Sequence, residues 1–187
     1  MSNNQLIEDL KHKIYILKLR LMLQLKMLEL ARYQSMLPTE NGKKMYQAAV
    51  PCLGIDASPE DLADDELGCA ETWHQIYRKA FGEYFIADAY ERLSTRRLKL
   101  KLDVSVLFMK VTDPLPGDTV LSATGFGGTK AVPVGHVGVM GENGIIMSND
   151  SRDGTFDANY TLDSWRRRYV EKGNFAMDFY RRKDIIN

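Results

Sequence analysis

The spacing of hydrophobic residues changes once along the chain, close to Asp103, and this change limits the folds open to it. Before Asp103, apolar residues recur every three or four positions, which is typical of helices. After it, short apolar runs alternate with turn residues, which is typical of strands. Helices followed by an antiparallel sheet define the α+β class, so we expect an α+β fold.

Turn residues set the boundaries of the expected elements. We expect helices at residues 5–37, 43–52, 70–81, 87–102 (one helix or a pair) and 162–170, and strands at residues 108–111, 119–123, 136–140, 145–148 and 175–180. An acidic loop should occupy residues 56–66, and Asn143-Gly144 predicts a hairpin. The exposed side of 87–102 should carry its basic residues, Arg92, Arg96, Arg97, Lys99 and Lys101. Turn formers at residues 38–42 divide the chain into residues 1–37 and 38–187.

Residues 5–37 predict a long amphipathic helix that precedes the rest of the fold. A heptad seam with one polar break at Gln24 runs through Leu10, Ile14, Leu17, Leu21, Leu28 and Ala31. A second apolar stripe, which should widen this face, runs through Ile16, Leu19, Leu23 and Leu30. Six Lys and Arg outnumber three Asp and Glu. Such a helix should form a coiled coil, dock on the following domain or lie on an anionic membrane surface, so we expect a homo-oligomer or a membrane-surface contact.

Composition excludes several classes of function. Lys and Arg balance Asp and Glu at 25 each, so the chain lacks the basic excess of a nucleic-acid binder. Two cysteines allow one disulfide at most, and three dispersed histidines lack the spacing of a zinc site, so no metal or other cofactor is expected. The polar N-terminus is unlike a signal peptide, and charged residues interrupt the apolar stretch 14–30, which argues against a transmembrane helix.

Cys69 is the strongest candidate for a nucleophile. It follows Gly68 at the first turn of the helix expected at 70–81, where unpaired N–H groups favour a thiolate and can bind an oxyanion. A buried, unreactive cysteine is the alternative. Cys52 lies on an apolar helix face and is interpreted as structural.

His136 is the best candidate for the base that a thiol nucleophile needs. It begins a strand in Gly-His-Val-Gly-Val, where an imidazole can face a cleft, although a strand histidine can also be structural. His12 lies among lysines and should be solvated, and His74 should point to a different side of its helix from Cys69.

A third residue should orient the imidazole through its other ring nitrogen. The predicted hairpin returns Ser148, Asn149 and Asp150 alongside His136, and the alternation of side chains does not decide among them while the geometry of the turn is unknown. Asn149 is favoured, with Asp150 as the alternative. Simple turn chemistry would also explain these residues.

Three motifs together give the chain a family resemblance. Gly68-Cys69-Ala70-Glu71 opens a helix, Pro116-Gly117-Asp118-Thr119-Val120 enters a strand, and Gly135-His136-Val137-Gly138-Val139 precedes an Asn-Gly hairpin. This pattern resembles the NlpC/P60 and CHAP cell-wall hydrolases of the papain-like cysteine peptidase superfamily, over about residues 48–182. Family members commonly carry a polar residue before the cysteine, where this chain has Gly68.

The resemblance implies a papain-like domain with helices packed on a small antiparallel sheet. It gives Cys69 the role of nucleophile, His136 that of base and Asn149 that of orienting residue, in a peptidoglycan endopeptidase or amidase that forms an acyl-enzyme. Segments 146–151 and 159–169 are similar to a phage- or bacterium-associated, endolysin-like subgroup, so the expected place of action is the cell wall. The alternative is a non-catalytic phage or cell-envelope structural or binding module that retains the fold.

Overall fold

The computed structural model of the chain describes residues 3–35, 37–56, 68–150 and 154–184. It consists of two compact units, Met1–Leu37 and Pro38–Asn187, which meet where the sequence predicts a boundary. Each unit is described separately below. None of the described helices combines the length and the apolar character that crossing a bilayer requires.

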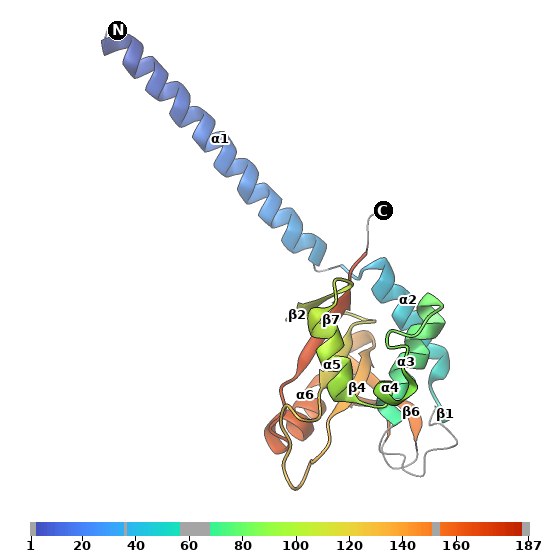
Figure 1. Cartoon of the computed structure of the whole chain (residues 1–187). Coiled ribbons are helices and arrows are strands. Elements are labelled where there is room, and N and C mark those ends of the chain that lie inside the picture. The colour runs from blue at the N-terminus through green and yellow to red at the C-terminus, as the bar shows by residue number, and fades with distance from the viewer. Residues whose placement is uncertain (1–2, 36, 57–67, 151–153, 185–187) are drawn as a thin grey trace. The chain divides into compact units, whose positions relative to one another are not determined.

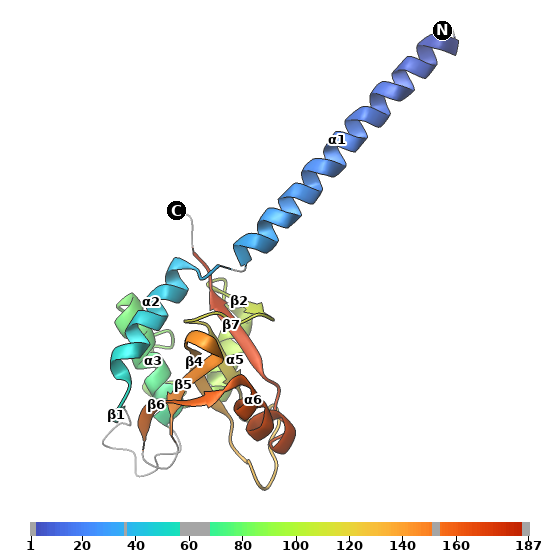
Figure 2. The same cartoon turned by 180° about the vertical axis from the view of Figure 1, so that it is seen from behind.

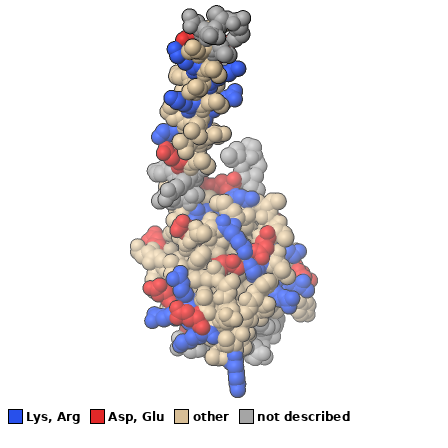
Figure 3. All heavy atoms as spheres, turned by 90° about the vertical axis from the view of Figure 1, so that its left-hand side faces the viewer, with Lys and Arg blue, Asp and Glu red and all other residues tan. Residues whose placement is uncertain are grey.

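The first unit is one continuous helix, α1 (Asn3–Ser35). Its seam residues from Leu10 to Leu28 are strongly exposed, from 50% at Leu10 to 67% at Leu28, and the second stripe is exposed at Leu19, Leu23 and Leu30. Because each residue turns an α-helix by about 100°, residues two apart, such as Leu21 and Leu23, lie on nearly opposite sides. The second stripe therefore does not widen the first face, and the expectation of a one-sided amphipathic helix is wrong. Figure 3 shows Lys and Arg side chains scattered among the uncharged ones on α1.

The second unit is mixed α+β and is built on one antiparallel sheet, as predicted for the class (Figure 1). Its seven strands lie in the order β1-β6-β5-β4-β3-β7-β2. They are β1 (Ile55–Asp56), β2 (Phe108–Val111), β3 (Thr119–Ser122), β4 (His136–Met140), β5 (Ile145–Asn149), β6 (Thr155–Thr161) and β7 (Asp178–Arg182). The central hairpin β4–β5 turns through Asn143 and Gly144, both at positive φ, as Asn-Gly turns require.

Helices cover both faces of the sheet (Figures 1 and 2). One apolar core contains Trp73 and Ile76 of α3 (Gly68–Phe81) together with residues of α2 (Glu40–Ala49) and α5 (Thr95–Val104), packed on Val137 and Val139 of β4. The opposite core packs Trp165 of α6 (Leu162–Trp165) and residues of the π-helix Arg166–Lys172 on the other face. Val137 and Met140 fall in different cores because side chains of a strand alternate between faces.

Several predicted boundaries shift for local reasons. The turn formers at residues 38–42 belong partly to a helix start, because Thr39 caps α2 by accepting a hydrogen bond from the Gly42 N–H. The segment 87–102 forms a helix pair, α4 (Ala89–Arg92) and α5. The last strand begins at Asp178 instead of Phe175, and strands β1 and β6 were not predicted. The acidic loop lies largely outside the described residues.

Two of the basic residues predicted to be exposed are not. Lys99 is only 7% exposed, and its Nζ donates to Asp178 Oδ2 at 2.6 Å and lies 3.2 Å from Asp103 Oδ2. The Arg92 Nε donates to Glu71 Oε2 at 3.0 Å. Both cations neutralise buried or half-buried carboxylates, which sequence periodicity alone does not reveal.

Asp118 of the Pro-Gly-Asp motif has a structural task. Asp118 and Arg181 are each 1% exposed, and Arg181 NH2 donates to Asp118 Oδ2 at 2.8 Å. The same carboxylate accepts the Leu115 N–H, which closes the turn before β3. This ion pair ties the entry of β3 to its neighbour β7.

Candidate active site

Cys69 lies in the first turn of α3, as the sequence predicts. Its side chain is 7% exposed and packs at the edge of the core between α3 and the sheet. Backbone hydrogen bonds reach its sulfur from the helix start, Cys69 and Ala70, and from Val137, the residue after His136. The thiol is therefore held against the beginning of β4.

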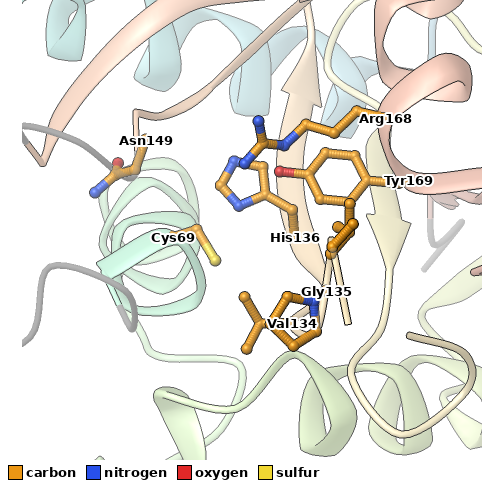
Figure 4. Close-up of a pocket in the computed structure, with 10 residues that line it drawn as sticks. Cys69, Val134, Gly135, His136, Asn149, Arg168 and Tyr169 are labelled. Carbon is orange, nitrogen blue, oxygen red and sulfur yellow. The ribbon is translucent and has the colours of Figure 1, made fainter. Parts of the chain in front are cut away.

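His136 begins β4, and a close approach of the backbone just before it fixes its position. A Cβ built on Gly135 would lie 2.0 Å from the carbonyl oxygen of Ser122, so only glycine fits between β4 and the end of β3. His136 and Cys69 line the same pocket, and Figure 4 shows one ring nitrogen of His136 on the side that holds the Cys69 sulfur.

The other ring nitrogen of His136 is bound by Ser148. Nε2 of His136 lies 3.1 Å from Ser148 Oγ, and that hydroxyl donates its own hydrogen to Asn159 Oδ1 at 2.8 Å. The Asn159 amide is oriented in turn by donating from Nδ2 to the Ser148 carbonyl. With its hydrogen committed to Asn159, Ser148 accepts from His136, so Nε2 carries the proton and Nδ1 is the basic nitrogen.

The structure thus places Ser148, and not the favoured Asn149 or its alternative Asp150, at the orienting position. The register Val139↔Met147 puts Ser148 on the same face of the sheet as His136, whereas Asn149 projects from the opposite face. The backbone of Asn149 and the charge of Asp150 do act on the ring, and both raise the pKa of His136. Asn159 lies on β6, the strand missing from the sequence-based prediction.

Two aromatic side chains, Tyr169 and Trp165, pack against the imidazole. The ring of Tyr169 stacks on His136 at a centroid distance of 5.4 Å and an interplanar angle of 13°. The ring centroid of Trp165 lies 5.3 Å from that of the imidazole, and Trp165 is fixed by donating its indole N–H to Ser122 Oγ. Tyr169 belongs to the π-helix, a distortion that is frequent at functional sites.

Burial determines the protonation states of the pair. It raises the pKa of the Cys69 thiol to about 11, which the backbone hydrogen bonds only partly oppose. It also lowers the pKa of His136 to about 4, helped by the positive charge of Arg168. Near neutral pH the resting site therefore holds a neutral thiol beside a neutral imidazole, and the thiolate expected from the helix N-terminus is not the resting form.

Cys69 lies between two pockets that share Val134 and Gly135 as a wall. The first, of about 160 Å³, contains His136, Asn149, Arg168 and Tyr169. The second, of about 330 Å³, is more apolar and is also lined by Leu93 and Tyr90. A chain-like substrate could therefore reach the sulfur from both sides.

The other sequence candidates lie away from this site. His74 is fully buried, donates from Nδ1 to the Ala70 carbonyl and lines neither pocket, as predicted from its place on the helix. His12 is exposed on α1. Cys52 is buried under Lys79, whose Nζ contacts its sulfur at 3.1 Å, in keeping with a structural role. Within the described ranges, no group of three His, Cys, Asp or Glu side chains could hold a metal ion.

Arg168 and Tyr169 line the first pocket but were not predicted as site residues. No motif signals them, because their position depends on how the segment after β6 folds back over the sheet.

Comparison with models of known protein families gives no match for this chain, and comparison with curated proteins gives none.

Proposed function

We propose that the protein is a cysteine-dependent hydrolase of peptide or amide bonds, with Cys69 as nucleophile and His136 as base. The observation that carries the proposal is the hydrogen bond between His136 and Ser148, from which the tautomer of His136 follows. Ser148 accepts from Nε2, so Nδ1 is the basic nitrogen, and the ring lies in the pocket that also contains the thiol. A basic ring nitrogen in the same pocket as a cysteine is what a thiol nucleophile needs.

The neutral pair defines the order of proton transfers. As the sulfur attacks a carbonyl carbon, its proton passes to Nδ1 of His136, so the thiolate forms only with substrate bound. The resulting imidazolium then protonates the leaving amine, and an acyl-enzyme remains on Cys69. Water activated by His136 releases the acyl group and restores the thiol.

The two pockets assign sides to the substrate. The leaving amine belongs to the pocket of His136, where the exposed Arg168 offers a positive charge to carboxylates. The acyl part belongs to the larger, more apolar pocket beside Leu93. Peptidoglycan, whose stem peptides combine small apolar residues with free carboxylates, is the substrate suggested by the resemblance to NlpC/P60 and CHAP hydrolases.

The test is digestion of purified peptidoglycan with measurement of both new amino groups and new reducing sugars. We expect the wild-type protein to release amino groups without reducing ends, Cys69→Ala to release none, and Cys52→Ala to match the wild type. A wild-type protein that releases no amino groups would contradict the proposal, and the fold would then serve binding or assembly in a phage or cell envelope.

A further inference from the structure

Asn149 presents a buried polar group that the proposed mechanism leaves unused. The residue is 2% exposed, and neither Nδ2 nor Oδ1 of its amide has a hydrogen-bond partner among the described residues. Buried amides are nearly always bonded, so an unpartnered one at a pocket calls for a function. Asn149 lines the pocket that Cys69 and His136 share.

Side chains of β5 alternate between the two faces of the sheet, so the neighbours Ser148 and Asn149 face different surroundings. Ser148 points to the face of His136, and Asn149 points to the face on which α3 packs. Figure 4 shows Asn149 and His136 on different sides of the Cys69 sulfur, both above it in this view. The amide and the base therefore approach the sulfur from different faces of the sheet within one pocket, so a substrate carbonyl oxygen can bind the amide while its leaving nitrogen faces His136.

The beginning of α3 supplies further donors at the same place. This helix has 14 residues, and the backbone groups of Cys69 and Ala70 in its first turn hydrogen-bond toward the Cys69 sulfur. The first N–H groups of a helix have no partner within it and carry partial positive charge. They suit an anion that forms next to the sulfur.

We propose that the side-chain amide of Asn149 and the N-terminus of α3 form the oxyanion hole of this site. The inference rests on the proposed function. Attack forms the S–C bond, moves the carbonyl π electrons onto oxygen and transfers the thiol proton to His136 Nδ1. Nδ2 of Asn149 donates to that oxygen until the electrons return, the C–N bond breaks and the amine leaves with the proton. Hydrogen bonds from these donors strengthen as negative charge develops on the carbonyl oxygen, and this lowers the barrier to acylation.

The test compares two reactions of the same thiol. Hydrolysis of a soluble stem-peptide substrate passes through an oxyanion, whereas alkylation of Cys69 by iodoacetamide displaces iodide from a saturated carbon and needs none. We expect Asn149→Ala to lower kcat by about 100-fold with little change in KM, while the alkylation rate of Cys69 stays within about twofold. Asn149→Asp keeps the shape but cannot donate when ionised, and it should lose at least as much.

Asn41→Ala is the matched control, because the Asn41 amide donates to the Lys183 carbonyl far from the site. It should keep the wild-type kcat. An undiminished kcat in Asn149→Ala, or an equal loss in hydrolysis and in alkylation, would overturn the oxyanion role while the proposed hydrolase stands. A wild-type protein without turnover would defeat both proposals.

Discussion

Nε2 of His136 lies 3.1 Å from the Oγ of Ser148, whose own hydrogen is given to Asn159. The base of this site is thus oriented by a neutral hydroxyl. A hydroxyl fixes the tautomer but stabilises the imidazolium less than a carboxylate would. This agrees with a pKa of His136 that burial and Arg168 lower to about 4.

Replacement of Ser148 tests this chain of hydrogen bonds from His136 through Ser148 to Asn159. Ser148→Ala removes the hydroxyl that accepts from Nε2, so the tautomer is less firmly fixed and Nδ1 carries the proton in part of the molecules. We expect kcat for hydrolysis of peptidoglycan fragments to fall by about tenfold or more with KM little changed. Ser148→Thr keeps the hydroxyl and should recover most of the activity. Equal activity of the Ala and Thr variants would show that the hydroxyl does not orient the base.

Acid should destabilise the fold through its buried histidines. Burial lowers the pKa of both His74 and His136 from 6.5 to about 4, so the unfolded chain binds protons between these values and the folded chain does not. Stability therefore falls as pH drops through this range. We expect a loss of about 2 kcal/mol for each histidine between about pH 7 and pH 5, measured by urea unfolding.

His74→Leu separates the two contributions. It removes an imidazole whose Nε2 is buried without a hydrogen-bond partner among the described residues, and it keeps an apolar side chain beside Trp73. The variant should show about half of the wild-type loss. An unchanged pH dependence would mean that His74 does not titrate in this way.

The buried ion pair of Asp118 and Arg181 should be essential for stability. Asp118→Asn removes the buried carboxylate that is paired with the Arg181 guanidinium, which is 1% exposed, and we expect the free energy of unfolding to fall by about 3–5 kcal/mol. Asp113→Asn, at an exposed neighbour whose backbone carbonyl serves Arg181, is the control and should change little. A similarly small effect in both variants would argue against a structural role for the pair.

Helix α1 should mediate association through its two opposite apolar stripes. Side chains such as Leu17 and Leu23 are 61% and 63% exposed, and covering both stripes requires neighbours on two sides. Light scattering should find the full chain in assemblies larger than a dimer and residues 38–187 as a folded monomer, with or without anionic vesicles. A monomeric full chain would contradict self-association, and binding to vesicles alone would identify the helix as a membrane-surface element.

Much of the fold could be predicted because hydrophobic periods are local signals. Strands at 108–111 and 136–140 agree with β2 and β4 residue for residue. Strand β6 was missed because Thr155–Thr161 contains Asp157 and Asn159, residue types that are rare in strands, and pairing with β5 overrides this preference.

The candidate site could be predicted only in part. Cys69 and His136 each carry a local signal, a helix start and a strand start, and the structure brings both to one pocket. The orienting residue depends on the register of β4 and β5, where a shift of one position exchanges Ser148 for Asn149. Arg168 and Tyr169 reach the pocket only through the tertiary packing of the π-helix.

Covalent catalysis by Cys69 is tested most directly by mass spectrometry of the protein quenched in acid during turnover of a soluble stem-peptide substrate. We expect an adduct with the mass of the acyl fragment on the peptide that contains Cys69, and no adduct in Cys69→Ala. Continued turnover by Cys69→Ala, or wild-type turnover with the only adduct on Cys52, would contradict Cys69 as the nucleophile.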